Sequence, residues 1–163
     1  MKNVTYIVLI FIVSLSSSVI AQDTTWFDAN WQITTKEKGE FYRPAPKKMN
    51  TGYWIIDFYK SGQKQMEGFS TSDIPLQEAF DGRVMYFHEN GKPYHIANYK
   101  NGKLNGSRKV FYDTGELKEE GRYRDGKREG IWKTFLKGGK IESRGKYKNG
   151  EKVGIWKTFY KNI

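Results

Sequence analysis

The sequence predicts an all-β protein, an extended antiparallel meander of repeated β-hairpins behind an N-terminal signal peptide. Two observations indicate the hairpins. Glycine, phenylalanine and tyrosine recur every 24 residues in the C-terminal half. Each whole repeat also contains Asn-Gly or Asp-Gly, the strongest short signal for a two-residue hairpin turn. The composition argues against a helical bundle, because the chain is only 37% hydrophobic and 16% aromatic, and each interior glycine would cost a helix about 1 kcal/mol.

The N-terminal segment has the features of a secretory signal. A short basic start precedes residues 4–20, which are apolar or small, and polar sequence follows Ala21. This pattern predicts a signal peptide over residues 1–21 with cleavage after Ala21. The alternative is a retained membrane anchor, but the strongly apolar residues 6–13 are too few to span about 30 Å of hydrocarbon. We therefore expect an exported protein in the periplasm, at the outer surface or secreted.

The rest of the chain divides into a cap and a repeat domain. Residues 22–50 do not repeat, and we interpret them as an N-terminal cap with one or two short strands, because repeat arrays need covered ends. The repeat domain is predicted over residues 51–163. Its copies occupy 51–70, 82–105, 106–129 and 130–153, with a shorter copy at 154–163. Residues 70–80 are longer than the matching link and predict an inserted loop or short helical turn.

Each unit is expected to contain two strands joined by tight turns. Asn101-Gly102, Asp125-Gly126 and Asn149-Gly150 predict type I′ turns, which need positive φ at both central residues. Asn90-Gly91 and Thr114-Gly115 predict the same kind of turn at the other end of the hairpins. The result would be an antiparallel sheet with two strands per repeat.

The register of one hairpin follows if Leu136 faces Ile141 across the turn. Trp132 then faces Gly145, whose bare backbone would lie beneath the indole. Paired and alternate residues share a face of a sheet. One face is therefore expected to be aromatic and apolar, and to include Leu136 and Ile141. The other face would be charged with a single line of Phe, and the open edge of the copy at 154–163 would be available to an added strand.

The recurring residues resemble the MORN repeat, specifically its bacterial variant, which is often described as antitoxin-like. The residues that carry this resemblance in one unit are Gly130, Trp132, Phe135, Gly139, Gly145, Tyr147 and Gly150. The resemblance covers about residues 52–163. It implies an extended β-hairpin sheet that acts as a scaffold or interaction surface. The sequence departs from the pattern at Ala97, where Gly is expected, and at Val84 and Arg108, where Trp is expected.

The sequence contains little that predicts chemistry. It has no cysteine, which excludes disulfides, thiolate metal sites and a cysteine nucleophile. His88 and His95 are the two histidines, whereas a metal site needs three or four ligands. His88 occupies a slot that is aromatic in other units, so we expect it to replace an aromatic ring in packing. The Gly-Lys pairs at 102–103 and 126–127 lack the frame of a phosphate-binding loop. We expect no enzyme, no cofactor and no metal.

Two sets of residues are candidates for binding. The aromatic set could form either the core of the sheet or a groove, and comprises Tyr112, Tyr123, Trp132, Tyr147, Trp156 and Tyr160. The basic set recurs at fixed repeat slots and forms two rows, Lys100, Arg124 and Lys148, and Lys109, Lys133 and Lys157. Residues 82–163 hold twenty Lys and Arg against nine Asp and Glu, whereas residues 22–81 hold seven against nine. The positive charge therefore belongs to the repeats.

These features predict a non-enzymatic exported module that binds a protein or scaffolds an assembly in the cell envelope. One alternative is adhesion to an anionic lipid or polysaccharide through the basic rows, at about 1 kcal/mol per basic residue near a charged bilayer. Another alternative, which rests on the resemblance, is an antitoxin-like inhibitor of a partner toxin. Nucleic acid is not expected as a partner, because export removes the protein from it.

Overall fold

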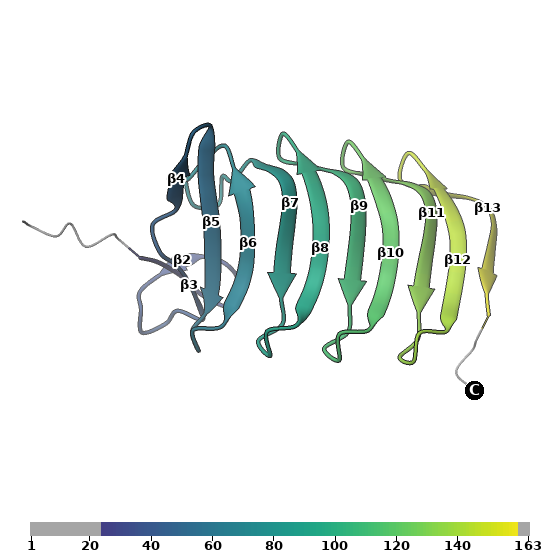
Figure 1. The fold of residues 1–163 in the computed structure, drawn as a ribbon, viewed down its shortest axis with the longest axis horizontal. Helices are drawn as coiled ribbons and strands as arrows, with labels where there is room; N and C mark the ends of the chain where they lie inside the picture. Colours follow the sequence, from purple (N-terminus) through teal and green to yellow (C-terminus); the bar gives the residue numbers. More distant parts are fainter. Residues whose placement is uncertain (1–23, 160–163) are drawn as a thin grey trace, which may run out of the picture.

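The structure is a computed structural model that describes residues 24–159. The predicted signal peptide and Tyr160 lie outside the described residues. The described chain is all-β, with thirteen strands in one sheet (Figure 1). The strands are β1 Thr25–Phe27, β2 Ile33–Thr34, β3 Phe41–Arg43, β4 Lys47–Met49, β5 Gly52–Tyr59, β6 Lys64–Ser70, β7 Phe80–Phe87, β8 Pro93–Lys100, β9 Lys103–Phe111, β10 Leu117–Arg124, β11 Lys127–Phe135, β12 Ile141–Lys148 and β13 Glu151–Thr158.

The strand order confirms the predicted open meander. From β5 to β13 every strand pairs antiparallel with the next strand along the chain. Figure 1 shows β7 to β13 side by side in a single layer, with the short strands β1–β4 gathered at the β5 end. No helix of membrane-spanning length and apolarity occurs within the described part of the chain.

The N-terminal end of the sheet holds a cluster of buried apolar side chains. Ile55, Met66 and Val84 are 2% exposed or less and pack together. The guanidinium of Arg43 on β3 forms a two-pronged ion pair with Asp57 on β5, from Nε to Oδ1 at 2.6 Å and from Nη2 to Oδ2 at 2.8 Å. Both residues are buried, and desolvation raises the pKa of the Asp57 carboxyl. A buried charge needs such a partner to be tolerated.

The segment between β6 and β7 is a loop without a helical turn. Its ends are closed by the Thr71 N–H, which donates to the Ala79 carbonyl at 3.0 Å. Its carboxylate Glu78 accepts a hydrogen bond from Arg43. The loop is therefore tied to the buried ion pair. Residues 24–50 contain four short strands, where the sequence predicts one or two.

The two ends of the hairpins use different turns. Asn101 and Gly102 have φ of 49° and 73°, and the Asp125 and Asn149 turns repeat this geometry, which confirms the predicted two-residue turns. At the opposite end the prediction is wrong, because Gly91 has positive φ and Asn90 does not. The Gly91 N–H donates to the His88 carbonyl and the His88 N–H to the Lys92 carbonyl, both at 2.8 Å. That pattern is a wider turn closed by a single left-handed glycine.

The turn at residues 136–140 has the same hydrogen bonds as the turn at Gly91, and it shifts the predicted register at the end of the β11–β12 hairpin. Trp132 pairs with Gly145 as predicted. Ile141, however, pairs with Phe135, and Leu136 donates its N–H to the Lys140 carbonyl within the turn at 2.9 Å. The irregularity follows Thr134, so Ile141 shares a face with Phe135. The prediction that Leu136 and Ile141 face each other on the aromatic side is therefore wrong.

The sheet has two distinct faces, which we call the aromatic face and the basic face. The aromatic face is defined by Trp132, Tyr147 and the residues in register with them. The basic face is defined by Lys133, Arg144 and Lys146, which occupy the alternating positions of β11 and β12. Successive repeats extend both faces along the sheet.

Candidate functional site

Each tryptophan of the aromatic face lies over a glycine of the preceding strand. A Cβ on Gly121 would be 2.2 Å from two ring carbons of Trp132. A Cβ on Gly145 would be 2.1 Å from the ring of Trp156. Real Cβ atoms do not approach so closely, so only glycine fits at both positions. The sequence predicts that Gly145, the ladder partner of Trp132, lies beneath the indole, and this prediction is wrong. The glycine beneath Trp132 is Gly121, because the indole leans towards β10.

In the earlier repeats, other side chains take the place of the tryptophan over the preceding strand. Val84 occupies the tryptophan slot and lies 2.9 Å from the Cβ position of Gly68. In the next unit Arg108 occupies the tryptophan slot and pairs with Ala97. Ala97 is fully buried. The two departures from the repeat pattern therefore occur together, since a methyl group beneath the slot leaves no space for an indole above it.

The rings of the aromatic face form a continuous ladder across β10 to β13. Tyr123, Trp132, Tyr147 and Trp156 follow one another with centroid distances of 5.3, 5.7 and 5.0 Å. Successive rings are nearly perpendicular, at 75–84°, an arrangement in which each ring edge meets a ring face. The guanidinium of Arg128 lies over Trp132 at 4.2 Å, and the ammonium of Lys152 over Trp156 at 4.5 Å. The ladder is thus partly covered by cations.

The predicted aromatic candidates divide into three groups. Trp132 and Tyr147 are 2% and 8% exposed and belong to the core of the sheet. Tyr123 and Trp156 are half-buried and remain accessible. Tyr112 lies apart from the ladder, where its hydroxyl donates to the Phe135 carbonyl at 2.7 Å.

The slot of Tyr112 links neighbouring repeats. The Tyr59 hydroxyl donates to the Phe87 carbonyl at 2.7 Å. In the next unit His88 Nε2 lies 3.3 Å from the Phe111 carbonyl oxygen. His88 therefore replaces the tyrosine in a hydrogen-bonding position, as well as packing edge-on against Tyr94.

A charged cluster beside the ladder was not among the predicted sites. Arg108 Nη1 forms an ion pair with Glu119 Oε1 at 2.7 Å, and Arg128 Nη2 approaches Glu119 Oε2 at 3.5 Å. Arg128 also donates to the Tyr147 hydroxyl at 2.9 Å. The one sequence signal for this cluster is Arg108 in a tryptophan slot. The cluster gives the aromatic face a pair of guanidinium groups, and Arg108 occupies the slot that holds Trp132 and Trp156 in later units.

His95 is the second histidine and also lies on the aromatic face. Its ring stacks on Tyr86 with centroids 4.1 Å apart. Burial lowers the pKa of His95 to about 4, and the nearby Arg108 charge acts in the same direction. The imidazole is therefore neutral near neutral pH. Within residues 24–159 no group of three or more His, Cys, Asp or Glu side chains is arranged to hold a metal ion.

The two basic rows have different surroundings. Lys100 lies opposite Lys103 and Arg124 opposite Lys127, at the end of the sheet that carries the two-residue turns. In the other row Lys133 forms an ion pair with Glu120 at 3.0 Å. The row Lys109, Lys133 and Lys157 runs across the basic face, whereas Lys100, Arg124 and Lys148 are exposed at the rim.

This geometry defines a class of protein, an open sheet of stacked β-hairpin repeats with two solvent-facing sides. Three consecutive units of the chain are MORN repeats of the variant type. The family model matches three consecutive units, residues 80–101, 104–125 and 128–149. Such repeats form binding or scaffolding modules.

Comparisons with curated proteins and with solved structures add little information about this chain. A search of curated proteins returns no match. Among solved structures, a crystal structure of accessory secretory protein 1,2 and 3 in Streptococcus pneumoniae is 17% identical, with a TM-score of 0.23. The match covers 65% of this chain and 18% of that chain, so the chain spans less than a fifth of that protein's length.

Proposed function

We propose that this protein is a non-enzymatic binding module of the cell envelope that uses its aromatic face to hold a partner protein. The observation that carries this proposal is the single-layer sheet, because nothing in the described chain covers its aromatic face and Tyr123, Trp156, Arg108 and Arg128 remain partly exposed there. Half-buried aromatic rings and arginines are the side chains most enriched at protein interfaces. The export signal predicted over residues 1–21 supports the envelope as its location.

The experiment is a comparative cross-linking and affinity capture from the envelope of the producing cell. The double variant Arg108→Ala/Arg128→Ala removes both guanidiniums from the aromatic face. The matched control Lys109→Ala/Lys146→Ala removes the same charge from the basic face. We expect a stoichiometric partner that is captured by the native protein and the control, and lost with the aromatic-face variant. Equal capture by all three proteins would contradict the proposal. A single toxin as the captured partner would identify the antitoxin role.

A second candidate function is favoured by the rim of the sheet. Like charges directly opposite each other in an antiparallel pair are destabilising, yet at two of the three rim turns Lys100 faces Lys103 and Arg124 faces Lys127, while Lys148 faces Glu151. The positive charges at such a rim would attract an anionic surface, either lipid or polysaccharide. We therefore propose that the rim contributes attraction to the envelope surface, in addition to the aromatic face.

The two basic rows supply a matched test of the rim. The triple variant Lys100→Gln/Arg124→Gln/Lys148→Gln and the triple variant Lys109→Gln/Lys133→Gln/Lys157→Gln remove the same charge. At low salt we expect the native protein and the second variant to co-sediment with vesicles rich in anionic lipid. The first variant should be lost from the pellet. Equal losses for both variants would show that net charge alone governs the attraction, and would refute a role for the rim.

A further inference from the structure

The sheet contains two copies of one hexapeptide in different surroundings. Gly-Ile-Trp-Lys-Thr-Phe occupies residues 130–135 and again 154–159. The first copy lies in β11, which is paired on both sides, by β10 and β12. The second copy lies in β13, which pairs with β12, and no described strand lies along its other edge (Figure 1). The first copy therefore shows the register in which a strand can pair with the outer edge of the second copy.

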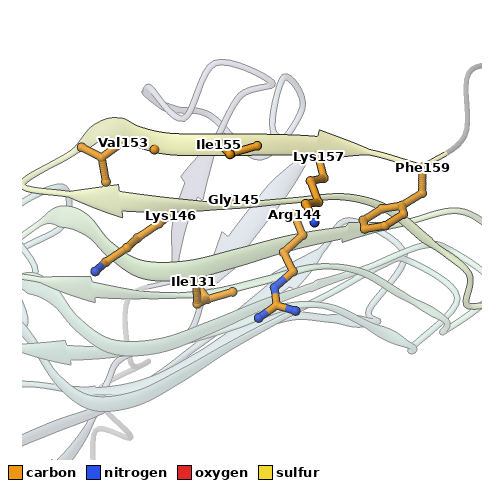
Figure 2. A pocket seen from close by; sticks show the side chains of 9 residues that line it. Ile131, Arg144, Gly145, Lys146, Val153, Ile155, Lys157 and Phe159 are labelled. Atoms are coloured by element: carbon orange, nitrogen blue, oxygen red, sulfur yellow. The ribbon is translucent and has the colours of Figure 1, made fainter.

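The second copy is more exposed at the corresponding positions. Trp132 is 2% exposed, whereas Trp156 is half-buried. Ile131 is 45% exposed, whereas Ile155 is 82% exposed. Figure 2 shows Val153, Ile155, Lys157 and Phe159 along β13, beside Arg144 and Lys146. Because the local sequence is the same, the difference in exposure arises from strand pairing. Strand β11 has a neighbour on both edges, whereas β13 has a described neighbour on one edge only.

The covering strand places an aromatic ring at a fixed position. In three successive hairpins the opening glycine of the first strand pairs with a tyrosine of the return strand. The pairs are Gly82 with Tyr99, Gly106 with Tyr123 and Gly130 with Tyr147. The Tyr147 ring meets the face of Trp132 edge-on at 5.7 Å. A strand added to β13 in this register would place an aromatic ring opposite Gly154 and against Trp156.

The charge on the basic face indicates a second feature of the added strand. Glu120 lies opposite Lys109 on one side and forms an ion pair with Lys133 on the other. Lys157, at the same repeat position, lies opposite Arg144. The hollow beside β13 is lined by Arg144, Lys146 and Lys157, with no acidic side chain among its residues. An acidic residue opposite Lys157 would offset this charge, three positions before the aromatic residue, as Glu120 precedes Tyr123.

The backbone of β13 offers donors along the same edge. The Phe159 N–H donates to the Glu142 carbonyl, at the end of β12 nearest the turn, at 2.8 Å. Because N–H groups alternate sides along a strand, the Thr158 N–H points away from β12. Unpaired edges of this kind bind extended segments by adding a strand, with side-chain positions supplying specificity.

We propose that the outer edge of β13 binds an extended strand of a partner protein that carries an acidic residue and, three residues later, an aromatic residue. The acidic residue lies opposite Lys157, and the aromatic ring lies opposite Gly154 against Trp156. This inference rests on the proposed binding function and adds a second site to it, at the edge rather than on the aromatic face.

The test is a titration of the isotope-labelled protein with an eight-residue peptide that has the sequence of β10, residues 117–124. We expect saturable binding, with the largest amide shifts at residues 154–158. The same peptide with Glu120→Arg, or with Tyr123→Ala, should bind about fivefold more weakly, as expected for loss of one cross-strand pair. In the protein variant Lys157→Glu the preference should invert, so that the Glu120→Arg peptide binds more tightly than its parent.

Blocking the edge provides the matched control. Thr158→Pro removes the outward N–H and should abolish binding, whereas Thr158→Val keeps it and should bind as the native protein does. Dispersed spectra of both variants would show that the sheet is intact, and if Thr158→Pro fails to fold, the inversion in Lys157→Glu decides the question alone. Absence of saturable binding, equal binding of all peptides, or shifts centred on β9 to β11 instead of residues 154–158 would overturn the proposal. So would a dimer that already pairs two β13 edges.

The two proposals fail independently. Arg108→Ala/Arg128→Ala alters the aromatic face and leaves the β13 edge in place, so peptide binding should persist in that variant. Thr158→Val and Thr158→Pro leave the two guanidiniums in place. If the native protein captures its partner but does not bind the peptide, the edge site alone is rejected.

Discussion

Trp132 lies flat on Gly121 of the neighbouring strand, so close that a single added methyl group would overlap the indole. This contact is the repeating unit of the aromatic face, and it recurs between Trp156 and Gly145. Because it joins one hairpin to the one before it, it stabilises the stacking of repeats rather than the hairpin itself. The glycines are required here for close approach, not for an unusual φ.

Gly121→Ala should therefore destabilise the protein by about 2 kcal/mol, through overpacking against a buried indole. Urea unfolding followed by tryptophan fluorescence measures this loss. The double variant Gly121→Ala/Trp132→Arg recreates the Ala97–Arg108 pair of the previous unit, and should recover part of the loss. An unchanged unfolding midpoint for Gly121→Ala would mean that the indole moves aside without cost.

The converse change belongs to the unit that lacks a tryptophan. Arg108→Trp should lower the melting temperature, because Ala97 fills the space that an indole needs and because Glu119 loses its ion pair with Arg108. Adding Ala97→Gly to Arg108→Trp should raise the melting temperature above that of the single variant. If the double variant melts no later than Arg108→Trp alone, the size match between the two slots is not the reason for their joint departure.

The link between repeats through Tyr112 gives a third prediction. Tyr112→Phe removes the hydrogen bond to the Phe135 carbonyl and should cost about 1 kcal/mol of unfolding free energy. Tyr59→Phe should have a similar effect, because it breaks the equivalent bond to Phe87. Tyr94→Phe is the control, since Tyr94 is 44% exposed and should change stability little. A Tyr94→Phe loss as large as that of Tyr112→Phe would contradict the prediction.

The pH dependence of stability should depend on His95. Its pKa is lowered from 6.5 to about 4 in the folded protein, so between these values the unfolded chain binds more protons. Stability from His95 is therefore complete above about pH 6.5 and is lost as the pH falls towards 4. Thermal unfolding from pH 7 to 4 measures this slope.

His95→Phe keeps a ring against Tyr86 and removes the titrating group, so the slope should decrease. His88→Gln removes the other histidine and should retain the slope due to His95. A slope that is unchanged in His95→Phe would assign it to other groups, such as the carboxylates.

The sequence determined the fold to a large extent, because every 24-residue unit carries its own turn residues and strand pattern. The Asn-Gly and Asp-Gly turns could be predicted since the need for positive φ is local. The wider turn at Gly91 could not, because Asn90-Gly91 is compatible with either turn, and its hydrogen bonds to Lys92 decide between them. The turn at residues 136–140 has the same hydrogen bonds as the turn at Gly91, and it shifts Ile141 to the basic face.

The sequence predicted which residues belong to the candidate site, but it did not predict which residues they contact. The repeat slots identified Trp132, Tyr147 and the basic rows, since periodic residues in a sheet form lines. Only the tertiary structure decided that Trp132 covers Gly121 rather than Gly145, and that Tyr112 links two repeats. The physical reason is that a strand's sequence specifies its two faces by alternation, whereas the direction in which a side chain leans depends on the strand beside it. For the same reason, identical hexapeptides became a buried strand in β11 and an open edge in β13.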